Sequence, residues 1–319
     1  MTSTVDLHIH TTASDGSDSP ALLLENLKKA GIRIFSVTDH DTVDGALEME
    51  TLVTSEFRFI RGIEFSCETP AGKCHILGYG FNPRHPAFAA ALEEGAQLRQ
   101  EKLFSRLRYL EDTLGITFTA EELAWIKGLK SPGKPHFGKL LVERGIAATV
   151  TEAIQKYINP HKPRRDRIPG STAVSAIVQA GGIPVWAHPL GGEGEKRLSA
   201  EEFRQQLDCL LELGIRGMEC CYSRYTHSDT EFLMGQAQSH GLLISGGSDY
   251  HGTCKKDRTV HSLFVTLRVV ISDKRQHALR NALRNGKGGE VDLLCDAHSC
   301  EGYGIVSNDK VVRCGVGYA

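Results

Sequence analysis

Residues 5 to 10 alternate apolar and polar side chains, which is the pattern of a β-strand with two different faces. Apolar residues occupy positions 5, 7 and 9, while Asp6, His8 and His10 point to the opposite face. Such a face has little reason to be buried unless a charged ligand meets it. Two imidazoles at alternate strand positions can reach one cation, although two surface histidines near the terminus would give the same pattern.

The chain has 319 residues, which is enough for one large domain or two ordinary ones. Its 37 basic and 39 acidic residues balance, so the overall charge indicates neither a long nucleic acid nor an anionic membrane as partner. No run approaches the roughly 18 apolar residues of a membrane span, and no signal peptide precedes the first strand. We therefore expect a cytoplasmic protein with no membrane partner; the oligomeric state stays open.

The cysteine content favours a reduced protein. There are nine cysteines, an odd number, with no CxxC pair, and Cys220 and Cys221 are adjacent. In a chain of this length, that pattern is typical of free, mostly buried thiols rather than of a disulfide framework. It offers no convincing catalytic thiol.

Strands and helices alternate along much of the chain, which predicts an α/β fold with a parallel sheet or barrel. Each predicted strand is a short apolar run, and each predicted helix has apolar residues at helical spacing. The predicted strands are 5–10, 32–37, 57–63, 74–81, 183–187, 215–221, 242–245 and 262–271, and the predicted helices are 20–30, 46–52, 200–213 and 274–285.

The texture changes between about residues 83 and 157, where the sequence is helical and charged and no strand pattern occurs. We interpret this stretch as a helical insertion beside the main domain. The expected organisation is a discontinuous barrel domain of residues 1–82 and 158–287, an insertion of residues 83–157, and a tail of residues 288–319 whose role is unknown.

Metal-type side chains gather at the carboxyl ends of the predicted strands. Barrels and open α/β sheets place their active sites at that edge. Chance does not readily put imidazoles and carboxylates at the same end of so many strands, so the pattern predicts a metal site. The residues concerned are His8, His10, Asp39, His40, Glu64, His188, Glu219, Asp249 and His251.

Several motifs occur in an order that resembles the polymerase and histidinol phosphatase (PHP) family of metal-dependent phosphoesterases. They are DLHIH followed by SDG, TDHD, GIEFS, HILGYG, AHP and GGSDYHG, and they span residues 5 to about 252. The subgroup resembled has a helical insertion and includes nucleoside 3′,5′-bisphosphate phosphatases and a ribosyl cyclic phosphate phosphodiesterase. The resemblance implies a distorted (β/α)7 barrel with two or three divalent ions in its mouth, most often Mn²⁺, with Fe²⁺ or Zn²⁺ as alternatives.

The resemblance also implies a set of metal ligands. Imidazole and carboxylate groups together suit these metals, at about 2.0–2.2 Å. The first ion would take His8, His10, Glu64 and Asp249; the second would take Asp15, His40 and His251; and Glu64 would bridge to a third held by His75 and His188.

His75, Asp39 and Glu219 differ from the other residues at the strand ends. His75 begins its predicted strand rather than ending it, so a hydrogen-bonded barrel histidine is an alternative interpretation. Asp39 and Glu219 fit better as residues that orient the imidazoles of the ligands.

The expected chemistry is hydrolysis of a phosphoric ester. Divalent ions close together would lower the pKa of a shared water, supply a bridging hydroxide, and neutralise charge on the phosphoryl oxygens. The leaving oxygen then needs a proton, for which Asp249 and His251 are the candidates. No Ser-His-Asp arrangement or Gly-x-Ser-x-Gly elbow offers a competing nucleophile.

Basic stretches near the end of the insertion indicate how a substrate is held. Basic side chains suit phosphate dianions, although a solvated surface explains any single one of them. Together they suggest a small substrate with a second phosphate, and the Arg-Arg-Asp at 164–166 departs from the small residue and Tyr-Val of nucleotide-cleaving relatives. The candidate substrate-binding residues are Lys134, His136, Lys162, Arg165, Ser223 and Arg224.

These features favour a phosphodiesterase that opens a cyclic phosphodiester of ribose phosphate and then removes the remaining monoester. The alternative is a nucleoside 3′,5′-bisphosphate phosphatase that also trims short oligonucleotides from the 5′ end, and histidinol phosphatase fits the insertion less well. A non-catalytic PHP interaction module would predict missing ligands, and none is missing. A metal-dependent amidohydrolase also opens with HxH, but a strand with a carbamylated lysine is absent.

Overall fold

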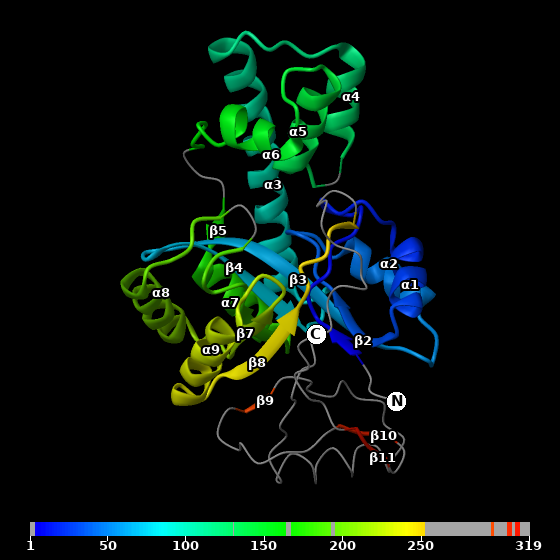
Figure 1. Cartoon of the computed structure of the whole chain (residues 1–319), viewed down its shortest axis with the longest axis vertical. Coiled ribbons are helices and arrows are strands. Elements are labelled where there is room, and N and C mark those ends of the chain that lie inside the picture. Colours follow the sequence, from blue (N-terminus) through cyan, green and yellow to red (C-terminus); the bar gives the residue numbers. More distant parts are fainter. Residues whose placement is uncertain are drawn as a thin grey trace.

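The computed structural model describes residues 4–129, 131–163, 167–192 and 195–252, together with three short strands further on. The strand predicted at 262–271 and the helix predicted at 274–285 lie outside the described residues. Figure 1 shows a mixed α/β body with a group of helices at one end.

The body is a sheet that curls into a nearly closed barrel. The chain just after the first strand lies beside the strand at 243–247 and the residues that follow it. The Leu7 amide donates to the Gly246 carbonyl (3.2 Å), and Ile9 and Tyr250 form an isolated β-bridge. The α/β barrel expected from the sequence is therefore confirmed. In order across the sheet, the strands are β1 (Thr4–Asp6), β2 (Ile32–Val37), β3 (Arg58–Thr69), β4 (Gly72–Tyr79), β6 (Ile183–Trp186), β7 (Gly217–Tyr222), β8 (Leu243–Gly247) and β9 (Cys295–Asp296), with β5 (Ile168–Pro169) paired to β3. The separate hairpin β10 (Ile305–Ser307) and β11 (Lys310–Val312) lies in the tail.

Strand β4 runs antiparallel to both of its neighbours, β3 and β6, which the alternating pattern did not predict. Strand β3 continues past the predicted end at Ile63 as far as Thr69, and a tight turn through Gly72 returns the chain as β4. Gly72 has φ of 140°, a conformation that favours glycine. Because of this reversal, the beginning of β4 lies at the sheet edge where the parallel strands end.

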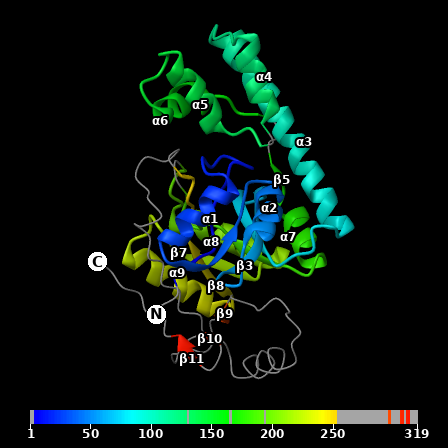
Figure 2. The same ribbon diagram turned by 90° about the vertical axis from the view of Figure 1, so that its right-hand side faces the viewer.

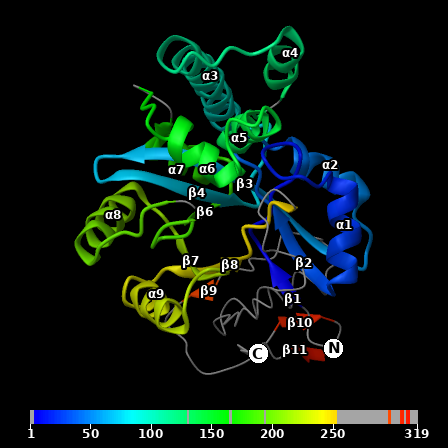
Figure 3. The same ribbon diagram turned by 45° about the horizontal axis from the view of Figure 1, so that its top comes forward.

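Helices cover the outer face of the sheet (Figure 3). The sequence marks their ends: Ser19 accepts a hydrogen bond from the Leu22 amide at the start of α1, and a Ser199–Glu202 capping box starts α8. Their apolar stripes are buried against the strands. These helices are α1 (Pro20–Lys29), α2 (Asp44–Leu52), α7 (Gly170–Gln179), α8 (Ala200–Leu213) and α9 (His227–Ser239).

The predicted insertion consists of helices with a hydrophobic cluster of their own (Figure 2). Only α3 belongs to both parts: Phe88 and Leu98 pack into the barrel's cluster, whereas Leu103 and Leu107 pack into the insertion's. The elements are α3 (Pro86–Arg108), η1 (Tyr109–Thr113), α4 (Ala120–Gly128), α5 (Lys134–Glu143), α6 (Val150–Ala153) and η2 (Ile154–Ile158). In the described part of the chain, no helix is both long and apolar enough to cross a membrane.

Candidate metal centre

The carboxylate of Glu64, on β3, lies at the centre of a ring of imidazoles. It is fully buried, and five histidines contact it. Its oxygens lie 2.9 Å from His40 Nδ1, 3.0 Å from His75 Nδ1, 3.0 Å from His188 Nε2, 3.3 Å from His10 Nε2 and 3.4 Å from His8 Nε2.

Two further carboxylates flank this ring. Asp15 lies 3.3 Å from His251 Nε2 and 3.9 Å from His40 Nε2. Asp249, just after β8, lies 3.2 Å from His10 Nε2 on one oxygen and accepts a hydrogen bond from the Tyr222 hydroxyl (2.9 Å) on the other. The structure thus brings all nine residues of the predicted ligand set to one place.

The ligand atoms form three overlapping groups, within each of which all of them lie within 4.8 Å of one another. The grouping differs in detail from the sets implied by the family resemblance, because His10 is shared between two groups and His40 joins Glu64 and His75. His188 stands beside the third group, with its Nε2 at 3.2 Å from His75 Nδ1. The groups are His10, Asp15, His40 and His251; His8, His10 and Asp249; and His40, Glu64 and His75.

Several polar atoms of this cluster are buried and form no hydrogen bond, although they face one another. Leaving buried donors and acceptors unsatisfied costs free energy, and native proteins rarely do so without a reason. Imidazole nitrogens and carboxylate oxygens are the donors that Mn²⁺, Fe²⁺ and Zn²⁺ accept, so the residues fit divalent ions. The atoms are His8 Nε2, His10 Nε2, Asp15 Oδ1, His40 Nδ1 and Glu64 Oε2.

The electrostatics of the cluster favour charged side chains. Burial opposes the charge of His10, but the carboxylates of Asp249 and Glu64 outweigh it and raise the pKa of His10 to about 9. Burial likewise opposes the charge of His188, yet Glu195 and Glu64 raise its pKa to about 10. Burial would raise the pKa of the Glu64 carboxyl, but the surrounding histidines hold it well below the usual range.

The backbone is strained at the same edge. Among the described residues, three that are not glycine have left-handed φ angles: Asp41 (52°), His188 (29°) and Asp249 (53°). Each follows a strand end, and such conformations cost on the order of 1–3 kcal/mol unless the surroundings enforce them. Close approach adds a constraint, since a Cβ on Gly247 would lie 2.4 Å from the Cβ of His8. The strained backbone and the close packing at this edge are unfavourable by themselves, and they are kept where they bring these side chains together.

The two residues expected to orient imidazoles behave differently. Glu219 is 3.0 Å from His8 Nδ1 through one oxygen and accepts the His188 amide at 2.8 Å through the other. Asp39 instead accepts hydrogen bonds from Thr11 and Ser14, so it contacts the loop after β1 rather than an imidazole. The Ser14 hydroxyl lies between Asp39 and His10, at 3.5 Å from His10 Nδ1.

His75 meets the cluster because of the antiparallel β4. It is the partner of Ser66 in the β3–β4 ladder, and its ring faces Glu64 two residues earlier on β3. In an antiparallel strand, the starting residues lie at the edge where the neighbouring parallel strands end. Strand direction thus explains why a ligand stands at the beginning of its strand.

Of the predicted substrate-binding residues on the insertion, Lys134 and His136 lie near the cluster. They begin α5 next to Gly133, where an added Cβ would lie 3.5 Å from the Asp15 carboxylate. Lys134 Nζ donates to Asn159 (2.8 Å), and burial together with Arg106 and Arg167 lowers its pKa to about 8. Lys162 is exposed at the insertion's end, and Arg165 lies outside the described residues.

Ser223 and Arg224 follow β7. The Ser223 hydroxyl donates to the Ser248 carbonyl (2.9 Å), which holds the loop before Asp249 and leaves Ser223 less suited to a substrate. Arg224 is exposed.

Two contacts near the cluster were not predicted. Glu195, in the loop after β6, lies 3.4 Å from His188 Nδ1 and accepts the Gly192 amide. Asp41 and Arg99 form a buried ion pair. Neither has a sequence signal, because a loop glutamate has no periodicity and a basic residue on an amphipathic helix is ordinarily solvated.

No family model matches the chain. The chain is 28% identical to a 3′,5′-nucleoside bisphosphate phosphatase of Chromobacterium violaceum, over 80% of this chain and 90% of that protein. It is 29% identical to a 5′-3′ exoribonuclease of Haemophilus influenzae (80% and 92%) and 28% identical to a phosphoribosyl 1,2-cyclic phosphate 1,2-diphosphodiesterase of Eggerthella lenta (77% and 94%).

Solved structures resemble the fold, among them two bacterial proteins. One, a C. violaceum protein described as an amidohydrolase and solved with bound sulfate and no metal, has a TM-score of 0.71 and 27% identity, over 81% of this chain and 90% of that one. The other, a Bifidobacterium adolescentis protein assigned as a metal-dependent phosphoesterase, has a TM-score of 0.70 and 25% identity (89% and 96%). The resemblance to metal-dependent phosphoesterases is thereby confirmed: the chain is a homologue of phosphoric ester hydrolases.

Proposed function

We propose that the cluster around Glu64 holds two or three divalent ions, with Mn²⁺ as the first choice, and that the protein hydrolyses phosphoric esters there. The observation that carries this proposal is the set of buried imidazole and carboxylate atoms that face one another without hydrogen bonds. A site that served only stability would ordinarily pair such atoms, and five of the ten buried side-chain atoms without a hydrogen bond in the described residues gather in this one cluster. The nine predicted ligands would hold the ions, and Glu219 would fix the ring of His8.

When bound, the ions would supply Lewis-acid activation of water and neutralise charge on the phosphoryl group. The chain's own residues orient the ligand side chains and supply a proton to the leaving oxygen. The His251 Nδ1 lies 2.8 Å from the Asp249 carbonyl, an arrangement that directs its Nε2 toward Asp15. The Tyr222 hydroxyl fixes the Asp249 carboxylate. We keep Asp249 and His251 as the residues that transfer a proton to the leaving oxygen.

For the substrate, we propose a nucleoside 3′,5′-bisphosphate. Two named relatives act on nucleotides or RNA. Lys134 directly follows Gly133, where an added Cβ would lie 3.5 Å from the Asp15 carboxylate, so its amino group is a candidate for binding a second phosphate. Trp125 is 37% exposed with its ring 6.0 Å from that of His136, which provides an aromatic surface for a base. A cyclic ribose phosphate is the alternative substrate. The sequence signal for it is at residues 164–166, which lie outside the described residues. One relative, 28% identical to this chain, is named for that reaction.

The test is phosphate release in Mn²⁺ from adenosine 3′,5′-bisphosphate and from a ribose 5-phosphate cyclic diester, measured side by side. We expect a higher kcat/KM with the bisphosphate. A large preference for the cyclic diester would overturn the substrate proposal and leave the phosphoesterase proposal intact. No turnover of either ester by protein with confirmed bound metal would contradict both.

The remaining predictions also stand as proposals. The separate cluster of the insertion supports the division into a barrel of residues 1–82 and 158–287 and an insertion of residues 83–157. The five cysteines at positions that the structure describes are all free, in agreement with the reduced, cytoplasmic setting that we propose.

A further inference from the structure

A buried ion pair joins the long helix α3 to the edge of the candidate metal centre. Arg99 Nε lies 2.8 Å and its Nη2 lies 2.6 Å from the same oxygen of Asp41. The side chains of Arg99 and Asp41 are only 9% and 4% exposed. Arg99 Nη2 also donates to the Ser66 hydroxyl (3.3 Å). Because both charges are buried, the cost of removing one partner is larger than for a surface pair.

Asp41 contacts both segments that carry ligands on this side of the cluster. It follows His40 directly in the chain, and its amide donates to the Glu64 carbonyl (3.0 Å). Its second carboxylate oxygen accepts the Ser66 amide at 2.7 Å. The Asp41 side chain thus holds the loop after β2 against strand β3. These two segments carry His40 and Glu64, whose Nδ1 and carboxylate oxygen lie 2.9 Å apart.

The conformation of Asp41 shows that this arrangement is imposed. Its φ of 52° is left-handed, which an aspartate adopts at a cost. The three hydrogen-bonding contacts of its carboxylate offset that cost. Helix α3 packs directly against Asp41 at Gly95, where an added Cβ would lie 3.4 Å from the Asp41 Cβ.

We propose that Asp41 and Arg99 are positioning residues for the reaction: through them, helix α3 fixes the relative placement of His40 and Glu64. The inference rests on the proposed metal centre, and it assigns to the root of the insertion a role in metal affinity. Removing the pair lets the loop after β2 relax from its left-handed conformation, so His40 leaves the geometry that a shared ion requires. Residues that orient metal ligands in this way typically change metal affinity or activity about 10–100-fold.

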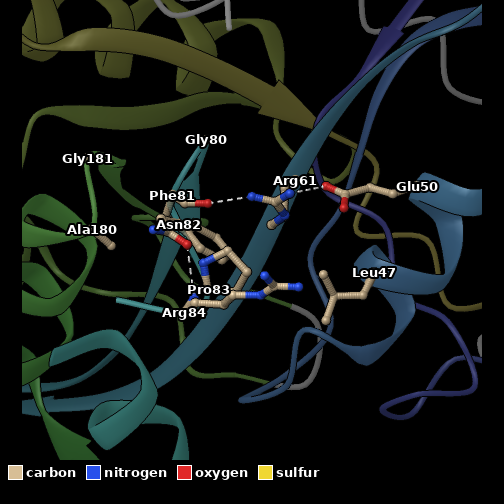
Figure 4. Close-up of a pocket in the computed structure, with 10 residues that line it drawn as sticks. All are labelled: Leu47, Glu50, Arg61, Gly80, Phe81, Asn82, Pro83, Arg84, Ala180 and Gly181. Carbon is tan, nitrogen blue, oxygen red and sulfur yellow. Dashed lines mark hydrogen bonds and ion pairs between the residues drawn. The ribbon is translucent and has the colours of Figure 1, made fainter. Parts of the chain in front are cut away.

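The test compares Arg99→Met with a matched control, Arg61→Met. Arg61 also joins β3 to a helix: its Nη2 lies 2.6 Å from Glu50 on α2, and its Nη1 donates to the Phe81 carbonyl (2.7 Å). Figure 4 shows this arginine in a pocket of about 400 Å³ whose lining includes none of the nine predicted ligands. Isothermal titration of each full-length variant with Mn²⁺, together with kcat and KM, gives the readouts.

We expect Arg99→Met to weaken Mn²⁺ binding about 10–100-fold and Arg61→Met to leave it unchanged. Arg99→Lys keeps the charge but not the fork, and we expect partial recovery. Asp41→Asn tolerates the left-handed backbone and provides a second variant should Arg99→Met fail to fold. If the two residues act as one unit, the variant that combines Asp41→Asn and Arg99→Met should bind Mn²⁺ no more weakly than the weaker-binding single variant.

Equal Mn²⁺ affinities for Arg99→Met, Arg61→Met and the unaltered protein would overturn the positioning role, even if all three lose thermal stability alike. Failure of the proposed function has a different signature. In that case the unaltered protein would show no turnover, while the Mn²⁺ titrations would still report on the pair.

Discussion

The two faces of strand β3 use charged side chains in opposite ways. On the inner face, Glu64 meets five imidazoles, and several of the atoms form no hydrogen bond. On the outer face, three residues earlier, the two terminal nitrogens of Arg61 are paired with Glu50 and with the Phe81 carbonyl, while its buried Nε forms no hydrogen bond. Side chains at odd and even positions of a strand point to opposite faces, so one strand serves both purposes.

The difference separates residues kept for chemistry from residues kept for stability. Buried polar atoms without hydrogen bonds and left-handed backbone both destabilise a fold, and their coincidence at one site indicates that a function requires them. Paired charges under a helix contribute modestly to stability and do nothing for a reaction. Substitutions on the inner face should therefore change activity more than stability, and those on the outer face should do the reverse.

The largest expected effect is that of Glu64→Gln. This change removes the carboxylate shared by the imidazoles, and we expect kcat/KM to fall by about 10³-fold, the upper range for one electrostatic group. Metal content measured after dialysis should fall as well. A variant that keeps its metal and its activity would remove the distinction between the two faces.

A smaller effect is expected for Glu219→Gln. The amide can still meet the His188 backbone but no longer offers a carboxylate to His8 Nδ1. We expect Mn²⁺ affinity and kcat/KM to fall about 10–100-fold. Titration calorimetry measures the affinity, and Glu202→Gln at the exposed start of α8 is the control. An unchanged affinity would show that Glu219 serves packing alone.

The pH dependence of metal binding should expose the charged state of the inner face. The pKa of His10 is raised to about 9 and that of His188 to about 10, from an ordinary 6.5. Their stabilising contribution to the metal-free fold is therefore complete below pH 6.5 and is lost as the pH rises through those values. Metal must displace these protons, so affinity should increase with pH.

The corresponding measurement is the Mn²⁺-induced increase in melting temperature between pH 6.5 and 8.5. We expect the metal-free melting temperature to fall over this range while the Mn²⁺-induced increase grows. An increase that is independent of pH would contradict the predicted protonation of His10 and His188.

The smallest effect on activity is expected on the outer face. Glu50→Gln breaks the ion pair with Arg61, whose side chain is 21% exposed, and should cost about 1 kcal/mol in the free energy of unfolding. Activity and Mn²⁺ affinity should stay within about twofold. Urea denaturation and steady-state kinetics check the two halves of this expectation. A loss of activity greater than that of Glu219→Gln would reverse the comparison.

Much of the fold could be predicted from the sequence because local patterns agree with it. Helix α8 begins and ends where its capping box and Gly214 indicate, and β2 spans the predicted residues. The direction of β4 could not be predicted, since a strand's apolar pattern does not reveal its orientation. Only the turn at Gly72 sets that direction.

The candidate site shows the same division. Residues such as His8 and His188 stand at strand ends, where topology alone gathers them. Glu195 contacts His188 from a loop, and Arg99 contacts Asp41 beside the cluster from a distant helix. Both contacts depend on tertiary packing. The position of Asp39 in the sequence predicts a carboxylate that orients an imidazole. In the structure, Asp39 instead accepts its hydrogen bonds from Thr11 and Ser14 in the loop after β1.

The central claim is that Glu64 and its imidazoles hold divalent ions. The most direct measurement is anomalous diffraction at the manganese edge from crystals grown with Mn²⁺. The account predicts two or three peaks within the cluster, each at about 2.0–2.2 Å from the imidazole and carboxylate atoms of the predicted ligands. A cluster without any peak in crystals of Mn²⁺-saturated protein, with ions bound elsewhere, would contradict it.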